Sequence, residues 1–363
     1  MTSTRTIPIF VLALALAGCS AGGQPPTPTP GATPTLSPTS PGQLVLLTHD
    51  SFKISDAVLE QFKQANGVTV QVLRAGDAGA MVNQAILTAD NPLADVLYGV
   101  DNTFLSRALD AGIFETYRSS LADSTAPALR LDDRERVTPI DYGDVCLNYD
   151  REAFGDAAPA PATLEDLAKP EYRSQLVVEN PATSSPGLAF MLATVARFGE
   201  SGDYTWLDYW QDLRDNDVLV TAGWEVAYYT SFSGGSGEGD RPIVVSYATS
   251  PAAEVYYAEP QPAEAPTGVV TDGCFRQVEF AGVLAGAKQP ALAKSLIDFM
   301  LSADFQADIP LNMFVFPAVP TTPLPQVFVD NAAQVAVPLT MAPDTIAANR
   351  ERWLGEWTDV VIH

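Results

Sequence analysis

Three aromatic side chains, Trp224, Tyr228 and Tyr229, lie close together in the sequence and could bind a flat ligand. The surrounding residues predict a helix, on which Trp224 and Tyr228 share one face because they are four positions apart. Aromatic rings attract cations and stack on flat heteroaromatic rings. The same spacing is also typical of rings that pack in a core, so spacing alone leaves both interpretations open.

Polar side chains, most of them acidic, are predicted to gather where strands end. His49, Asp50, Asp77 and Asp101 all fall at such ends. Ligands of open α/β sheets bind outside the carboxyl ends of strands. Ser184 lies in a serine-rich turn directly before a predicted helix. The N–H groups of that turn could bind a phosphate or a carbonyl oxygen, although helix capping explains the turn equally well.

Composition and motifs argue against several classes of protein. The net charge of −24, from 44 acidic and 20 basic residues, argues against nucleic-acid binding, which depends on Lys and Arg. His49 and His363 are the only histidines, which disfavours a metal site. There is no G-x-S-x-G motif, and the GGSGEG loop (234–239) lacks the Lys of a phosphate-binding loop. We predict a binding protein without enzymatic activity or cofactor. An envelope hydrolase that uses His49, or a scaffold with a vestigial cleft, are the alternatives.

The elements that must position these side chains begin in a β-α-β-α-β order, which indicates an open sheet with helices on both faces. The expected strands are 43–48, 68–73, 95–98, 139–150, 176–179, 243–247 and 273–283. The expected helices are 55–66, one that ends near residue 89, 188–198, 206–214, 290–302 and 342–357. Strands 139–150 and 273–283 are long enough to pass between two lobes.

The folded part begins near Gln43 and holds about 320 residues, more than one hydrophobic core usually serves, which predicts two lobes. Before it, an apolar run (7–17) too short to span a bilayer ends at Leu-Ala-Gly-Cys19. This pattern resembles the bacterial lipoprotein box, so we expect a signal peptide (1–19) and lipidation of Cys19. Residues 20–42 are rich in Pro and Thr and are expected to be a disordered tether. No later stretch is long and apolar enough for a transmembrane helix.

Two cysteines remain in the folded part, Cys146 and Cys274, and both lie in strand-like segments. A lone pair in an extracytoplasmic protein predicts one disulfide, although two separate buried thiols are the alternative. If strand 273–283 runs beside residues 141–150, the two sulfur atoms can meet.

Nine motifs, in order along the chain, resemble the thiamine-binding proteins of bacterial ABC importers. They are THDSF (48–52), the Asp77 loop, DVLYGVDN (95–102), PIDYG (139–143), NPATSSPGL (180–188), GWEVAY (223–228), VVSYATSPA (244–252), KQPALAKSLIDFMLSADFQADIP (288–310) and FVFP (314–317). The resemblance implies an α/β, two-lobed periplasmic-binding-protein fold (type II), in which each lobe is a mixed sheet flanked by helices. It implies lobe 1 at 43–143 and 275–363, and lobe 2 at 144–274.

The resemblance also implies roles for individual residues. Thiamine or a thiamine phosphate would lie in the cleft, where Asp77 faces the cation and Ser184 serves the phosphate or hydroxyl end. Trp224 and Tyr247 would line the site. The other candidate site residues are His49, Asp50, Asp101, Tyr228 and Phe314. We expect a lipid-anchored monomer that delivers the ligand to a membrane permease and its ATPase.

Three positions depart from the family pattern: His49 replaces a tyrosine, Ala253 an aromatic residue and Phe314 a tryptophan. They leave thiamine, its phosphates and a related pyrimidine open as ligands. A ferric-ion-binding protein of the same superfamily is the alternative, with Tyr256-Tyr257 or Tyr228-Tyr229 beside His49, because anionic oxygens suit iron. The motifs GWEVAY and SYATSP argue against it.

Overall fold

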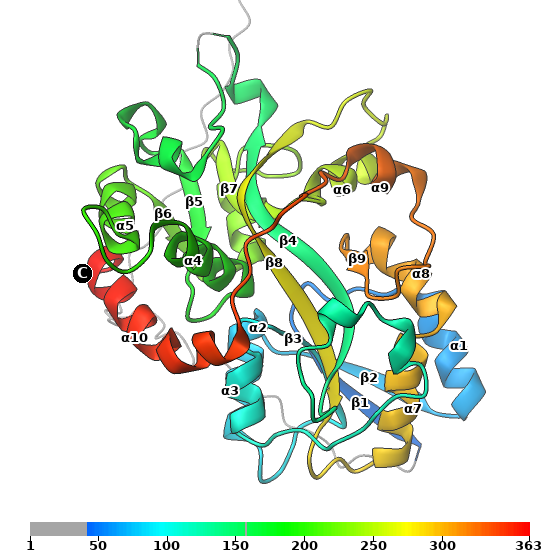
Figure 1. The fold of residues 1–363 in the computed structure, drawn as a ribbon. Coiled ribbons are helices and arrows are strands. Elements are labelled where there is room, and N and C mark those ends of the chain that lie inside the picture. The colour runs from blue at the N-terminus through cyan, green and yellow to red at the C-terminus, as the bar shows by residue number, and fades with distance from the viewer. Residues whose placement is uncertain (1–41, 157) are drawn as a thin grey trace, which may run out of the picture. The chain divides into compact units, whose positions relative to one another are not determined.

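The computed structural model describes residues 42–156 and 158–363, and their centre is one mixed sheet (Figure 1). The predicted signal peptide, Cys19 and the tether up to residue 41 lie outside the described residues. The strands are β1 Gln43–Thr48, β2 Thr69–Arg74, β3 Val96–Asp101, β4 Thr138–Asp150, β5 Leu176–Glu179, β6 Leu219–Thr221, β7 Ile243–Tyr247, β8 Thr267–Val283 and β9 Phe316–Pro317. Their order is β2-β1-β3-β8-β4-β7-β5-β6, with β9 on β4.

Parallel pairs form both ends of this sheet, and antiparallel strands join them. β1 pairs with β2 and β3 in parallel, and β5 does so with β6 and β7. Between these groups, β8 runs antiparallel to both β3 and β4. The predicted pairing of the two long strands is therefore confirmed, as is the mixed α/β class.

Helices flank the sheet on both faces (Figure 1). They are α1 Asp56–Asn66, α2 Ala78–Leu87, α3 Leu105–Asp110, α4 Ser185–Phe198, α5 Trp206–Asp215, α6 Ser250–Tyr257, α7 Pro290–Met300, α8 Ala303–Asn312, α9 Gln326–Asn331 and α10 Pro343–Val361. Local signals set their ends. The Ser55 hydroxyl, for example, accepts the Val58 N–H at the start of α1, and Gly67 ends that helix with φ 63°.

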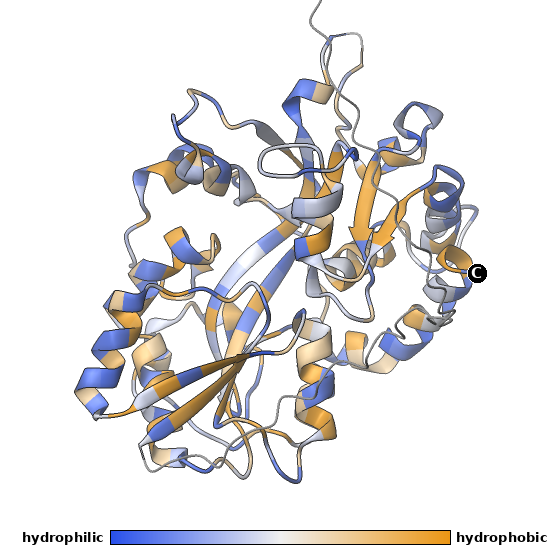
Figure 2. Ribbon diagram, turned by 180° about the vertical axis from the view of Figure 1, so that it is seen from behind, coloured by the Kyte–Doolittle hydropathy of each residue, from blue (hydrophilic) through white to orange (hydrophobic). Residues whose placement is uncertain are grey.

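Apolar side chains fill both faces of the sheet, and Figure 2 shows the apolar colour along the strands and in stripes along the helices. One core cluster packs α7 and α8 against one face of β1 and β3. A larger cluster packs α2, α4 and α5 against the opposite face and continues to Trp353 and Trp357 of α10. The strands are thus covered on both sides, as the continuous apolar runs of β1 and β3 predicted.

Two segments near the aromatic cluster differ from the predicted elements. Val226–Ser231 is a π-helix rather than an α-helix, and the Phe232 N–H bonds to the Ala227 carbonyl at 2.9 Å, five residues back. After β7, Ser250–Tyr257 forms α6, a helix that is not among the predicted elements. The sequence carried a signal for this helix, because Pro251 lies in its first turn, where proline is favoured.

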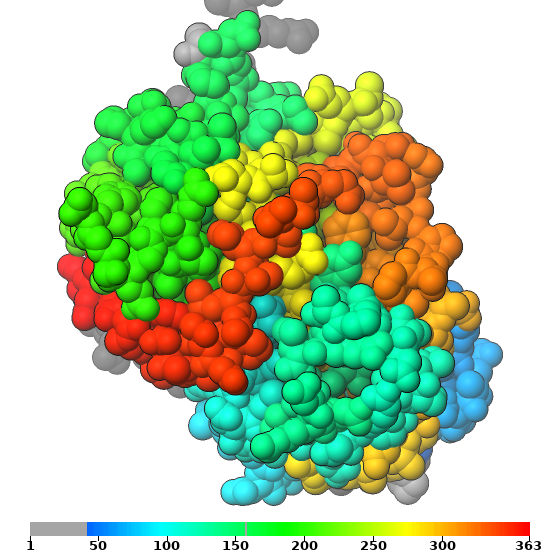
Figure 3. Space-filling view, in the orientation of Figure 1, coloured from blue at the N-terminus to red at the C-terminus, as the bar shows by residue number. Residues whose placement is uncertain are grey.

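The C-terminal part of the chain crosses the long strands. In Figure 3 the segment between α9 and α10 lies over β8, and the Leu339 N–H donates to the Cys274 carbonyl at 2.7 Å. Helix α10 then packs Trp357 against Trp210 of α5, with ring centroids 5.5 Å apart. Its Arg350 lies 4.7 Å above the Phe104 ring, beside α3. Among the described residues, no helix combines the length and the apolar character that crossing a membrane requires.

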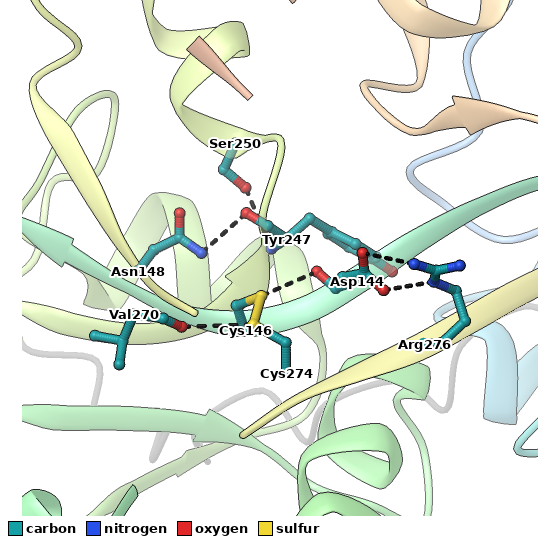
Figure 4. The surroundings of a disulfide bond; sticks show 8 residues. All are labelled: Asp144, Cys146, Asn148, Tyr247, Ser250, Val270, Cys274 and Arg276. Carbon is teal, nitrogen blue, oxygen red and sulfur yellow. Dashed lines mark hydrogen bonds and ion pairs between the residues drawn. A yellow bond between two sulfur atoms is a disulfide. The ribbon is translucent and has the colours of Figure 1, made fainter. Parts of the chain in front are cut away.

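The predicted disulfide between Cys146 of β4 and Cys274 of β8 is confirmed (Figure 4). The two Cα atoms are 4.4 Å apart. Beside it, Arg276 Nε donates to Asp144 Oδ1 at 2.5 Å, and this ion pair also joins the two strands. The disulfide and the ion pair therefore both connect β4 to β8.

Candidate ligand-binding site

Asp77 joins two distant segments of the chain. It caps the N-terminus of α2, where its Oδ1 accepts the Ala78 N–H at 2.7 Å. Its Oδ2 accepts the Trp224 N–H at 3.0 Å. Two residues after Asp77, Gly79 lies against the turn before α4: a Cβ there would be 2.8 Å from the Thr183 carbonyl oxygen. The start of α2, the turn before α4 and the start of the aromatic segment therefore meet at one place.

The aromatic rings form a layered wall at this place. Trp224 stacks on Tyr228 with centroids 5.0 Å apart, and the Tyr247 ring lies 6.5 Å from Trp224. Trp224 Nε1 donates to the Ser246 hydroxyl at 2.9 Å, which fixes the indole plane. Tyr228 is buried behind it and donates to Glu254 Oε1 at 2.7 Å. Trp224 and Tyr247 are half-buried and Tyr229 is exposed, so these three rings keep a surface for a ligand.

Asp101, at the end of β3, is buried beside this cluster. Its Oδ1 accepts the Thr103 N–H at 2.6 Å, and the Ser185 hydroxyl donates to its Oδ2. Burial raises the pKa of Asp101 to about 7, and the Asp77 charge adds a smaller increase. Ser184, the N-cap of α4, is fully buried, and its hydroxyl makes no hydrogen bond within the described residues.

The raised pKa of Asp101 makes a testable prediction about stability. Between about pH 4 and pH 7 the folded state holds a proton that the unfolded state has lost, so the free energy of unfolding falls as pH rises. Asp101→Asn cannot titrate, and its amide oxygen can accept the Thr103 N–H while its amide N–H donates to the Ser185 hydroxyl. Relative to the variant, the wild type should lose on the order of 4 kcal/mol across this range. Urea unfolding of both proteins at about pH 4 and pH 8 checks this, and parallel profiles would contradict it.

His49 lies beside a buried acidic group on the long strands. Its Nε2 is 3.4 Å from Glu279 Oε1, and Glu279 is the register partner of Asp141 across β8 and β4. Tyr98 donates a hydrogen bond to Asp141, and burial raises the pKa of Asp141 to about 6. Gly99, with φ 99°, makes room for the His49 ring, which any Cβ there would overlap. His49 thus contacts Glu279 of β8 and Gly99 of β3.

Two other predicted residues lie at the rim. Asp50 is exposed, and its Oδ1 accepts the Gly76 N–H at 2.9 Å, next to the Asp77 loop. Phe314 has φ 53°, and its ring lies 5.8 Å from Tyr256 and 5.5 Å from Tyr257. These two exposed tyrosines on α6 follow Ala253, the position where the family pattern has an aromatic residue. Phe314 therefore belongs to a second aromatic group rather than to the Trp224 wall.

Acidic side chains are concentrated at the site. Burial raises the pKa of Tyr247, and the carboxylates of Glu279, Asp77 and Asp101 raise it further, which indicates that all three lie near this ring. Among the described residues, no three His, Cys, Asp or Glu side chains are placed to hold a metal ion. A cavity of about 210 Å³ lies elsewhere, against the 117–139 segment, and none of the predicted site residues lines it. The site therefore suits a cationic organic group.

Sequence reasoning missed Glu179, Ser185 and Glu279. The sequence does contain a signal for the two glutamates, because Glu179 ends the apolar strand LVVE and Glu279 lies within the apolar segment QVEF. An acid in a buried strand is unusual unless it has a partner or a function. For Ser185 there was no such signal, since its partner Asp101 lies 84 residues away.

Comparisons with known proteins give the family. Residues 91–336 match the model of the bacterial extracellular solute-binding proteins. A thiamine-binding periplasmic protein of Escherichia coli strain K12 is 29% identical over 322 residues, which cover 88% of this chain and 93% of that protein. A solved periplasmic thiamin binding protein is 28% identical, with a TM-score of 0.75 over 88% of this chain and 96% of that one.

A ferric binding protein from Campylobacter jejuni shares the fold, with a TM-score of 0.69 and 18% identity over 87% of this chain and 99% of that one. At that identity the likeness concerns the fold alone. The family match covers most of the chain and describes extracytoplasmic binding proteins, not enzymes. The chain therefore belongs to the bacterial extracellular solute-binding protein family.

Proposed function

We propose that this protein captures thiamine or a thiamine phosphate outside the cell membrane and delivers it to an ABC permease driven by an ATPase. One observation carries the ligand assignment: the Asp77 carboxylate is hydrogen-bonded to the Trp224 N–H, directly beside half-buried aromatic rings. The thiazolium ring of thiamine is a permanent cation, which a carboxylate and π-faces attract. The similarity to thiamine-binding relatives supports the same ligand.

The two-lobed mechanism is part of this proposal. Residues 43–143 with 275–363 would form one lobe and residues 144–274 the other, with β4 and β8 as the hinge. The contact of Gly79 with Thr183 and the bond of Asp77 to Trp224 would then both cross the cleft and form on closure. Closure would exclude water and strengthen the charge and stacking contacts. A lipid on Cys19 would hold the monomer at the membrane.

Calorimetric titration of the purified protein tests the ligand. Thiamine, thiamine monophosphate, thiamine diphosphate and ferric citrate should be compared in the same buffer. We expect saturable binding of thiamine or one of its phosphates at one site per chain, without turnover. Binding of ferric citrate alone, with visible colour, would contradict the proposal and favour the iron-binding alternative.

Trp224→Ala should weaken thiamine binding by about 1–3 kcal/mol, because it removes the half-buried face of the aromatic wall. Trp224→Phe is the matched control: it keeps a smaller ring for stacking and loses the hydrogen bond to Ser246. The phenylalanine variant should retain most of the affinity in the same titration. Equal losses in both variants would mean that the indole N–H, and not stacking, matters.

A further inference from the structure

Helix α10 contacts both halves of the molecule. Near its C-terminal end, Trp357 packs against Trp210 of α5. Nearer its start, Arg350 lies 4.7 Å above the Phe104 ring, beside α3. Figure 1 shows α10 between these two helices. In the proposed two-lobed mechanism α5 belongs to lobe 2 and α3 to lobe 1, so α10 bridges the two lobes.

Several kinds of contact fix α10 to lobe 2. Besides the packed tryptophans, Arg214 of α5 donates a hydrogen bond to the Val360 carbonyl at 2.8 Å. Arg352 Nη1 lies 2.6 Å from a carboxylate oxygen of Glu200, which also belongs to lobe 2. These contacts hold the helix on α5, although the boundary expected from the sequence puts it in lobe 1. When the lobes separate, α10 is therefore expected to stay on lobe 2 and to leave α3.

Arg350 carries a buried charge into the contact with α3. Its side chain is 3% exposed, and its Nε makes no hydrogen bond within the described residues. Its Nη1 donates to Glu351 Oε1 at 2.7 Å, but the Glu351 side chain is 78% exposed. Arg107 of α3 lies 3.6 Å from the same oxygen, so two cations share one carboxylate. Burial lowers the pKa of Arg350, and the charges of Glu351 and Asp101 do not restore it.

The balance of these interactions opposes the contact between α10 and α3. Taking an ion out of water costs more than one cation–π contact returns. The exposed Glu351 adds little, because surface ion pairs are weak. The like charge of Arg107 repels the guanidinium. If α10 leaves α3 when the cleft opens, water reaches Arg350 again. Closing the cleft therefore buries a charge that has too few partners.

We propose that Arg350 opposes closure of the two lobes and thereby lowers the affinity for the solute. This inference rests on the proposed function, because it requires lobes that close around a ligand. Contacts with the ligand must offset the burial of Arg350 before the closed form dominates, so most ligand-free chains stay open. The same burial assists the opening that release of the ligand requires.

Arg350→Met tests the proposal, because methionine can still pack on the Phe104 ring and carries no charge. We expect thiamine to bind about 3- to 10-fold more tightly, since a larger fraction of the ligand-free chains is closed. Slower dissociation should account for most of the gain. The thermal midpoint of the ligand-free variant should not fall, because an apolar group replaces a poorly paired buried charge.

A pair of engineered cysteines measures closure without any ligand. A Cβ built on Gly223 lies 3.3 Å from the Asp77 Cβ, close to the Cβ separation found in disulfides. The two residues belong to different proposed lobes, so the double change Asp77→Cys with Gly223→Cys can be oxidised only in the closed form. Adding Arg350→Met should speed the oxidation about 3- to 10-fold, because the rate follows the closed fraction.

Two further variants are matched controls. Arg352→Met removes the same charge from the same helix, but Arg352 is 45% exposed and its partner Glu200 lies in lobe 2. It should leave both the thiamine affinity and the oxidation rate unchanged. Arg350→Lys keeps a charge at the contact, so it should bind thiamine no more tightly than the wild type does.

Several outcomes would overturn the proposal. Weaker thiamine binding by Arg350→Met, or a lower thermal midpoint, would mean that the arginine holds the two lobes or the fold together. An oxidation rate that Arg350→Met does not raise, or no oxidation in either background, would mean that Arg350 does not control closure. Wild-type protein that does not bind thiamine would refute the proposed function, whereas the oxidation rates of the ligand-free proteins would still decide this inference.

Discussion

Asp77→Asn is expected to lower the affinity for thiamine by roughly 10- to 100-fold at low salt, because the variant loses the charge that faces the thiazolium ring. The fold should survive the change. Asparagine is also a good N-cap, and its side-chain oxygen can still accept the Ala78 N–H. Its amide nitrogen cannot accept the Trp224 N–H, so this bond is lost with the charge. Salt screens the interaction of the charge with its ligand, so the loss should be smaller at high ionic strength. Calorimetric titration at two salt concentrations measures both effects.

Asp90→Asn is the matched control. Asp90 is exposed, beyond the C-terminal end of the same helix that Asp77 caps, and its replacement changes the net charge equally. It should leave thiamine affinity within about twofold of the wild type. If Asp77→Asn and Asp90→Asn lose affinity equally, the net negative charge of the protein attracts the ligand, and not the Asp77 carboxylate. If Asp77→Asn binds like the wild type at every salt concentration, the proposed location of the ligand is wrong.

The sequence predicted the framework of the fold well, because its signals are local. Continuous apolar runs marked β1 and β3, and Ser55 with Gly67 marked the two ends of α1. The extra length of β8, which begins at Thr267 rather than near Gly273, was missed. Asp272 and Gly273 interrupt the apolar pattern there, although the ladder with β4 continues on both sides.

The candidate site was harder to predict, because contacts across the chain decide it. The sequence named Asp77 and Trp224 but could not indicate that the carboxylate accepts the backbone N–H of the tryptophan, 147 residues away. Nor could spacing separate Tyr228, which is buried behind the wall, from Trp224, which is half-buried. On a regular helix both would share a face. The π-helix that begins at Val226 also brings the Tyr229 ring within 5.5 Å of Trp224.

The grouping of the buried acids could not be predicted for the same reason. Asp101, Glu179 and Glu279 all have pKa values that burial raises. Sequence shows that an acid interrupts an apolar strand, but only the assembled sheet shows that several such acids share one region. Their concentration costs stability, which proteins accept at binding sites more readily than elsewhere.

The disulfide is a long-range contact that the sequence did predict, together with the pairing of the two long strands. Its removal is the second change for which we expect a large effect. Replacing both Cys146 and Cys274 by alanine should lower the free energy of unfolding by about 2–5 kcal/mol. The bond closes a loop across a sequence separation of 128, so in the chain-entropy model it restricts the unfolded chain strongly. Denaturant unfolding of the oxidised wild type and the double variant measures the difference.

The position of the bond in the sheet explains why the fold should nevertheless persist without it. Val145 pairs with Phe275, yet Leu147 pairs with Val270, so residues 271–274 of β8 face the single residue Cys146. The disulfide ties the strands together where the regular ladder is interrupted, while the Asp144–Arg276 ion pair and the ladder hold them on either side (Figure 4). Thiamine affinity of the double variant should therefore stay close to that of the wild type at temperatures where it is folded. A large loss of affinity without unfolding would mean that the bond positions the site as well as stabilising the chain.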